Sequence, residues 1–153
     1  KMNLDATDKA LLNYIQQDAK QTHKELSMKL NLSVTATYER IKKLERTGVI
    51  KRYTALLDNK KLALGFVVFC HIKLVTHSEE NIINFEAAVA GLPEVMECFH
   101  VSGDYDYLLK VLVHDMEHFR NFMVSKLTSM EHVGSTTSSF TINQVKNTTS
   151  IHL

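Results

Sequence analysis

Hydrophobic residues near the start of the chain recur at helical spacing. Leu11, Leu12 and Ile15 form one apolar stripe. Residues three and four apart share one face of a helix, so this stripe predicts an amphipathic helix that packs inward. Asp8 precedes the stripe, and its negative charge suits the first turn of a helix, where the backbone dipole is positive.

A second helical stripe follows after a short polar interval. Leu26 and Leu30 are four residues apart and would line the inner face of this helix. Thr22 lies just before it, and Glu25 follows three residues later, which is the pattern of a capping box. Asn31 comes directly after the stripe and tolerates the left-handed backbone of a tight turn. The sequence therefore predicts a short capped helix that ends in a turn.

A third helix is predicted from Ser33, a residue type that caps helix N-termini, to Thr47, with Gly48 ending it. Three helices with a tight turn between the last two make a helix-turn-helix. The apolar residues in 49–57 indicate extended chain, which would supply a wing and an exit strand. The first part of the chain is thus predicted to be a winged helix-turn-helix.

From residue 65 onward the hydrophobic period changes. Strands are expected where apolar runs lie between turn residues, and helices where the helical spacing returns. The expected elements are a strand at 66–75, a helix that contains Ile82, Phe85 and Val89 and ends at Gly91, strands at 95–102 and 107–113, a helix capped by Asp115, and a strand from about 133 to 145. This βαββαβ order is that of a ferredoxin-like fold.

The fold class is therefore α+β, with two domains. Residues 1–52 are assigned to the helix-turn-helix, 53–64 to a linker strand, and 65–153 to the ferredoxin-like domain. Apart from His71 and Lys73, the strand at 66–75 is apolar on both sides, with Phe66, Val68, Cys70, Ile72 and Leu74 on one side and Val67, Phe69 and Val75 on the other. Two helices cover only one face of such a sheet, so a second copy of the chain is expected to cover the other as a homodimer.

Charge divides the chain at the same place. Residues 1–52 carry eleven Lys or Arg against six Asp or Glu, whereas the remainder carries seven against eleven. A basic domain suits a polyanionic partner, although a solvated basic surface has the same composition.

No apolar run approaches the roughly 18 residues of a membrane span. Cys70 and Cys98 lie in apolar runs, which favours buried, reduced thiols in a cytoplasmic protein.

The third predicted helix carries the residue types that contact DNA. At 100° per residue, Val34, Tyr38, Ile41 and Leu44 share a face that should pack inward. The candidate DNA-binding residues are at the cap, the opposite face and its edge: Ser33, Thr35, Ala36, Glu39, Arg40, Lys43 and Arg46. Thr and Ala reach base edges or a thymine methyl, and Arg and Lys reach guanine or phosphate. A solvated helix face would look similar, but the preceding capped helix and turn favour DNA binding.

Several stretches together resemble the Lrp/AsnC (leucine-responsive and feast/famine) regulators, over nearly the whole chain. They are Leu32-Ser33, Glu39 to Glu45, Gly48-Val49-Ile50, Tyr53 to Leu57 and Val101 to Lys110. Asn31 departs from the glycine that the family often has in the turn, and the Ser- and Thr-rich stretch 135–139 departs in the last strand. The resemblance implies a DNA-binding transcription regulator, dimeric through its sheets and assembled further into an octamer. A small effector, usually an amino acid, would modulate its assembly or DNA binding.

The resemblance places the effector site between dimers, at the hairpin before residue 107. Its residues would be Ser102, Gly103, Asp104, Tyr105 and Asp106, with Thr136 and Ser138 from the facing strand. An amino acid needs an acidic partner for its ammonium group, and N–H groups or hydroxyls for its carboxylate. The alternative is that the glycine and the aspartates only form the turn.

Other arrangements of reactive side chains give weaker signals. His114 and His118 have the spacing of two metal ligands on a helix, but His114 precedes the helix cap, so no metal is expected. No nucleophile with a nearby base stands out, so neither enzymatic activity nor a cofactor is expected. A stand-alone metabolic sensor whose first domain binds protein remains the alternative function, and the basic outer face of the third helix argues against it.

Overall fold

The computed structural model describes residues 3–153. The chain forms two compact units. The head unit contains the residues up to Leu56 together with Val145–Leu153, and the sheet unit contains Leu57–Gln144. The last nine residues thus belong with the head, although the sequence suggested that they belong to the second domain.

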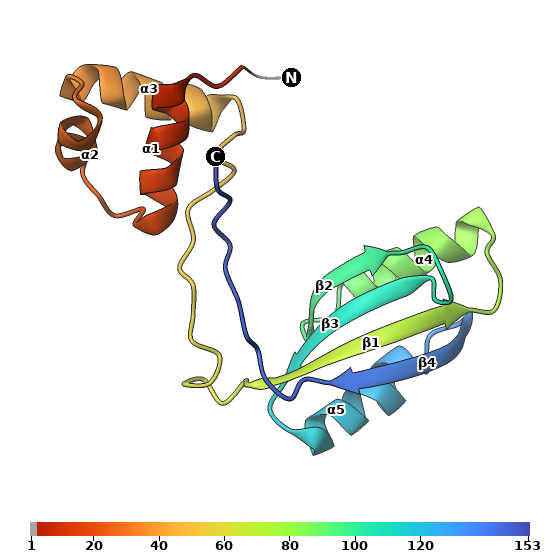
Figure 1. Cartoon of the computed structure of the whole chain (residues 1–153). Helices are drawn as coiled ribbons and strands as arrows, with labels where there is room; N and C mark the ends of the chain where they lie inside the picture. Colours follow the sequence, from red (N-terminus) through yellow and green to blue (C-terminus); the bar gives the residue numbers. More distant parts are fainter. Residues whose placement is uncertain (1–2) are drawn as a thin grey trace. The chain divides into compact units, whose positions relative to one another are not determined.

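Three helices build the head unit around a small apolar core (Figure 1). They are α1 (Ala6–Gln17), α2 (His23–Leu30) and α3 (Val34–Arg46). The core consists of five buried aliphatic side chains that come from all three helices: Leu11, Leu12, Leu26, Ile41 and Leu44. The inward positions predicted for Leu11, Leu12 and Leu26 are therefore confirmed, as are those of Ile41 and Leu44.

Polar caps fix where α2 and α3 begin. The Thr22 hydroxyl accepts a hydrogen bond from the Glu25 N–H at 3.1 Å, and the Glu25 carboxylate accepts one from the Thr22 N–H at 2.7 Å. The Ser33 hydroxyl accepts from the Ala36 N–H at 3.1 Å. Between these helices Asn31 has a φ of 53°, in the left-handed region. These contacts confirm the capping box and the tight turn of the helix-turn-helix.

The inner face of α3 is rotated from the predicted one. Thr37 is fully buried, whereas Val34 and Tyr38 are 47% and 40% exposed. The prediction that these two side chains pack inward was therefore wrong. A threonine is tolerated at the buried position because its hydroxyl donates to the Ser33 carbonyl at 3.0 Å, which satisfies its polar group.

The segment between the two units is not a strand. Residues 51–58 have no regular secondary structure, and turns follow at 59–63. The predicted exit strand and the linker strand over 53–64 are therefore not formed. A strand requires a neighbouring strand for its hydrogen bonds, and none pairs with this segment within the described residues.

The sheet unit has the βαββαβ order expected from the sequence. Its elements are β1 (Phe66–Leu74), α4 (Glu79–Ala90), β2 (Val95–His100), β3 (Tyr107–Val113), α5 (Met116–Phe122), continued by a π-helical turn (Met123–Leu127), and β4 (Val133–Phe140). The strand order is β2-β3-β1-β4, and each neighbouring pair is antiparallel. Only the end of β4 differs appreciably, because the strand stops at Phe140 rather than near residue 145.

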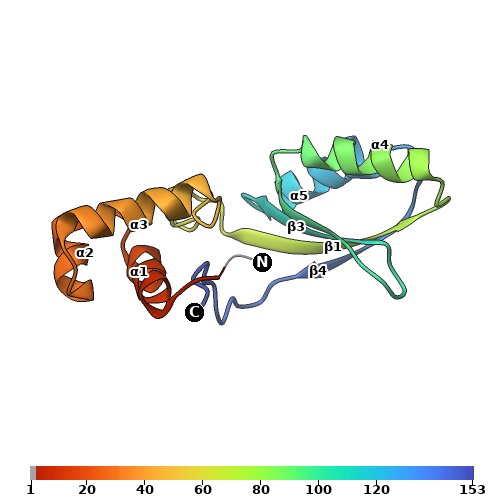
Figure 2. The same cartoon turned by 90° about the horizontal axis from the view of Figure 1, so that it is seen from above.

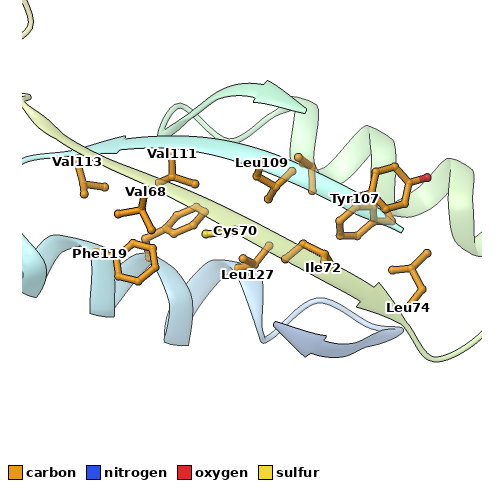
Figure 3. Packing of buried hydrophobic residues seen from close by; sticks show 13 residues of the cluster. Val68, Cys70, Ile72, Leu74, Tyr107, Leu109, Val111, Val113, Phe119 and Leu127 are labelled. Atoms are coloured by element: carbon orange, nitrogen blue, oxygen red, sulfur yellow. The ribbon is translucent and has the colours of Figure 1, made fainter. Parts of the chain in front are cut away.

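The helices α4 and α5 cover one face of this sheet (Figure 2). The buried face of β1 presents Val68, Cys70, Ile72 and Leu74 toward them (Figure 3). The opposite face includes Val67 and Phe69, which are only half-buried. The predicted two-faced sheet is therefore present in the chain, with helices on one side alone.

The two thiols lie in different surroundings. Cys70 is buried in the core, and burial raises the pKa of its thiol to about 11. Cys98 is exposed, so the prediction that both thiols are buried was wrong for this one. The reason is its position on β2, which is an edge strand of the sheet.

Candidate functional site

The outer side of α3 carries a strip of exposed side chains, here called the α3 strip: Thr35, Glu39, Lys43 and Arg46. Their spacing of three or four residues places them on one helix face. Among the other candidates, Ala36 is half-buried and Ser33 is occupied as the N-cap. The structure thus brings four of the seven candidate residues into one accessible row.

Lys42, next to the strip, contacts two side chains of its own helix. Its ammonium lies 2.9 Å from a Glu45 carboxylate oxygen, and it also lies over the Tyr38 ring at 5.6 Å. The other Glu45 oxygen accepts from the Tyr53 hydroxyl at 3.0 Å. Burial, and after it this hydrogen bond, raise the pKa of Tyr53 to about 12. Lys42 is therefore already paired with a carboxylate of its own helix.

Arg40 links α3 to the start of α1. One guanidinium nitrogen, Nη1, lies 2.7 Å from an Asp8 oxygen and 2.8 Å from an Asp5 oxygen. The Asp8 side chain is only 3% exposed and that of Arg40 is 31% exposed. The Asp8 N–H and then Arg40 lower the pKa of Asp5, and the two carboxylates raise the pKa of Arg40. This candidate base-reading residue is thus engaged in an ion pair with a buried carboxylate.

In the sheet unit, the hairpin at 101–106 is tied to the end of β1 by Asp106. One of its oxygens accepts from the Leu74 N–H at 2.7 Å, and the other lies 2.9 Å from His77 Nε2. Its own N–H donates to the Ile72 carbonyl at 2.9 Å. The Leu74 N–H, followed by His77, holds the pKa of Asp106 below its ordinary value. This carboxylate therefore serves the turn itself.

The tip of the same hairpin is open. Ser102, Gly103 and Asp104 are exposed. Gly103 has a φ of 118°, and a Cβ at this position would meet no atom within 4 Å. Glycine is thus required by the backbone conformation, and the space above it is free for another molecule.

Tyr105 leans from the hairpin onto the uncovered side of the sheet. Its hydroxyl donates to the Thr137 hydroxyl at 3.3 Å, and its ring lies 4.9 Å from that of His71. His71 and Thr137 are directly paired across β1 and β4. These three side chains form a polar cluster that the sequence did not indicate, although His71 and Lys73 are the polar residues of a largely apolar strand.

The two β4 residues predicted for the effector site pair with residues of the covered face of the sheet. Thr136 pairs with Ile72, and Ser138 pairs with Cys70, both of which face the helices. The Ser138 hydroxyl accordingly lies 4.0 Å from the Cys70 sulfur. The structure therefore does not bring these two residues to Tyr105, and Thr137 takes that place.

Metal and membrane signals are weak. Within residues 3–153, no three His, Cys, Asp or Glu side chains are arranged to hold a metal ion. His114 and His118 stack with ring centroids 5.2 Å apart, and the Nδ1 of His114 lies 2.8 Å from the Ala63 carbonyl oxygen. None of the helices in this described range is long and apolar enough to cross a membrane.

Family models match both units. Residues 4–51 match a winged helix-turn-helix DNA-binding model, and residues 67–151 match the Lrp/AsnC ligand binding domain. The chain belongs to the Lrp/AsnC family. This confirms the resemblance seen in the sequence and the fold class expected from it.

Curated relatives of this Lrp/AsnC protein span nearly its whole length. Transcriptional regulator AzlB of Bacillus subtilis is 35% identical over 148 residues, which cover 97% of this chain and 94% of that one. DNA-binding transcriptional activator DecR of Escherichia coli is 37% identical, with 97% of both chains covered. The leucine-responsive regulatory protein of Salmonella typhimurium is 39% identical, with 94% of this chain and 88% of the relative covered.

Solved structures agree with these relatives. A transcriptional regulator from Neisseria meningitidis in complex with L-methionine has a TM-score of 0.93 at 34% identity, covering 97% of this chain and 96% of that one. An AsnC family regulator from Agrobacterium tumefaciens has a TM-score of 0.93 at 36% identity and the same coverage. The Lrp/AsnC chain is thus a DNA-binding transcription regulator with a ligand-binding domain, and not an enzyme.

Proposed function

We propose that this regulator is a cytoplasmic homodimer and that it contacts double-stranded DNA through the α3 strip. We propose further that a small effector, an amino acid, changes its assembly or its DNA binding. The observation that carries the DNA part is the exposed row of Thr35, Glu39, Lys43 and Arg46 on the helix that follows the tight turn. In a helix-turn-helix the helix after the turn, here α3, enters the major groove.

The two ends of α3 carry different kinds of side chain. Lys43 and Arg46 lie in its last turn, where long side chains reach phosphates flanking the groove. Thr35 and Ala36 lie in its first turn, where short side chains reach base edges. The strip therefore supports phosphate contacts at one end of α3 and base contacts at the other.

Lys43→Ala is expected to weaken binding to duplexes of any sequence and to reduce the salt slope of log K by about one unit, because one phosphate contact is lost. Fluorescence anisotropy with a random duplex at several salt concentrations measures both quantities. Lys42→Ala is the matched control, since that lysine lies outside the α3 strip and pairs with Glu45. Equal loss of slope in both variants would contradict the assignment of phosphate contacts to the strip.

The open hairpin tip suits the ammonium group of an amino acid. Asp104 is exposed beside Gly103, whose conformation leaves the backbone accessible. Asp106 is engaged by Leu74 and His77, so its carboxylate is less available. The methionine bound to the Neisseria relative supports an amino acid as the class of ligand. The hairpin also includes Ser102, whose exposed hydroxyl can donate to a carboxylate, and Tyr105, whose hydroxyl could do so only by giving up its bond to Thr137.

Asp104→Asn is expected to remove the stabilisation by an amino acid, because the ammonium loses its charged partner. A ligand at 100 times its Kd stabilises the native protein by about 2.7 kcal/mol, and this is the shift that should vanish. Thermal unfolding with each of the twenty amino acids measures it. Glu131→Gln, at an exposed position, is the control and should keep the shift. A full shift in Asp104→Asn would mean that this aspartate only forms the turn.

Assembly completes the proposal. The sheet face opposite α4 and α5 would bury its apolar residues against the same face of a second copy, which gives a two-fold dimer. Four such dimers would form the octamer that the family resemblance implies. The effector hairpin would then lie between dimers.

A further inference from the structure

The final nine residues return to the head unit after the chain leaves β4. The end of this segment lies beside α1 (Figure 1). The side chain of Gln16 makes two hydrogen bonds to the backbone of the returning segment. Its amide nitrogen Nε2 donates to the Ile151 carbonyl at 2.8 Å, and its amide oxygen Oε1 accepts from the Ile151 N–H at 2.7 Å. A side-chain amide thus pairs with the backbone of one residue as a neighbouring strand would.

Asn13 repeats this contact one turn earlier on α1. Its Nδ2 donates to the Leu153 carbonyl at 3.3 Å, and its Oδ1 accepts from the Leu153 N–H at 3.4 Å. The two amides are three residues apart and so share one face of the helix. The two residues that they bind are i and i+2, which lie on the same side of an extended segment. The spacing of Asn13 and Gln16 along α1 therefore matches the spacing of Leu153 and Ile151 along the returning segment.

Apolar side chains accompany these polar contacts. Ile151 and Leu153 line a cavity of about 730 Å³ together with Leu12 and Ile15 of α1. Val49, Ile50 and Leu56, which follow α3, line it as well. The returning segment therefore contributes a wall to the head unit in addition to its hydrogen bonds.

We propose that the α1 surface around Asn13 and Gln16 is a docking site for residues 149–153 of the same chain, and that docking gives the DNA-binding head a second connection to the sheet unit. The first connection is the irregular segment that ends at β1. The second is 141–148, eight residues that reach at most about 29 Å when fully extended. Docking closes a loop of chain and restricts how far the head can move. Any effect of docking on DNA recognition rests on the proposed DNA-binding function.

Gln16→Ala in the full chain tests the docking site. Hydrogen exchange at the Ile151 amide should become roughly tenfold faster, because its N–H loses its acceptor and the segment opens. Trypsin cleavage after the exposed Lys146 should become faster as well. Alanine is a strong helix former, so α1 itself should remain intact. Slow exchange at the buried Leu11 and Leu44 verifies this.

Gln17→Ala is the matched control, since Gln17 is exposed on the same helix and no hydrogen bond joins it to the returning segment among the described residues. It should leave exchange at Ile151 unchanged. Unchanged exchange in Gln16→Ala, or the same acceleration in both variants, would overturn the proposal. Both measurements are made without DNA. A failure of the docking site is therefore distinguishable from a failure of DNA binding, which the random-duplex titration reports separately.

Discussion

Arg40→Ala is expected to destabilise the head unit by about 3 kcal/mol, because removing one partner of a buried ion pair leaves the other charge unpaired. Asp8 is the group at risk, since its side chain is nearly inaccessible to water and its closest cation is Arg40. Asp8 also lies within the capping box of α1, so the loss would loosen the start of that helix. The effect should therefore appear as lost stability first.

Hydrogen exchange at the Leu44 amide, in the core of the head, measures this change in the full chain. Arg46→Ala is the control on the same helix, and an exposed substitution of this kind usually changes stability by less than about 0.5 kcal/mol. At a temperature where the variant is folded, Arg40→Ala should keep the salt slope of duplex binding. Unaltered stability together with relaxed sequence preference would instead assign Arg40 to base recognition.

The local features of the fold were accessible from the sequence because they depend on near neighbours. Thr22 and Glu25 are three residues apart, and Asn31 adopts the left-handed turn without any distant contact. Alternation and helical spacing likewise predicted the βαββαβ order, since each pattern reports which side of its own element is buried. These are short-range constraints, and the structure confirms the capping box, the turn and the order of the elements.

The role of Arg40 depended on a long-range contact. Its partners Asp5 and Asp8 lie 35 and 32 residues away along the chain. From the sequence, Asp8 could be interpreted only as a favourable charge in the first turn of a helix. Helical phase also placed Val34 inward, although the true inner face is centred nearer Thr37. A helix wheel does not reveal where a neighbouring helix will pack.

The effector site shows the same limit in a strand. Side chains alternate between the two faces, so an error of one residue in register moves a side chain to the other face. Thr136 and Ser138 were taken from the family resemblance, and they stay predictions. In the structure they pair with Ile72 and Cys70, whose side chains face the helices, whereas Thr137 contacts Tyr105. The hairpin residues were located from the family motif.

The uncovered face of the sheet gives the second large expected effect. Besides Val67 and Phe69 of β1, it presents Leu108 and Leu112 of β3, which pair with His71 and Val67. All four apolar side chains are half-buried, whereas the same strands are fully buried on the helix side. Figure 2 shows that α4 and α5 both lie on that other side. This apolar face is the surface through which the homodimer is proposed to form.

Phe69→Asp is therefore expected to separate the dimer, because it places an unpaired carboxylate in the proposed interface. A cost of about 3 kcal/mol raises the dissociation constant more than a hundredfold. Light scattering at micromolar concentration should shift from a dimer or larger to the 17.4 kDa monomer. Ile83→Asp on α4, where Ile83 is 57% exposed, should remain assembled. Since Phe69 points away from the core of its own chain, Phe69→Asp should stay folded, and a folded variant that remains a dimer would place the interface on another surface.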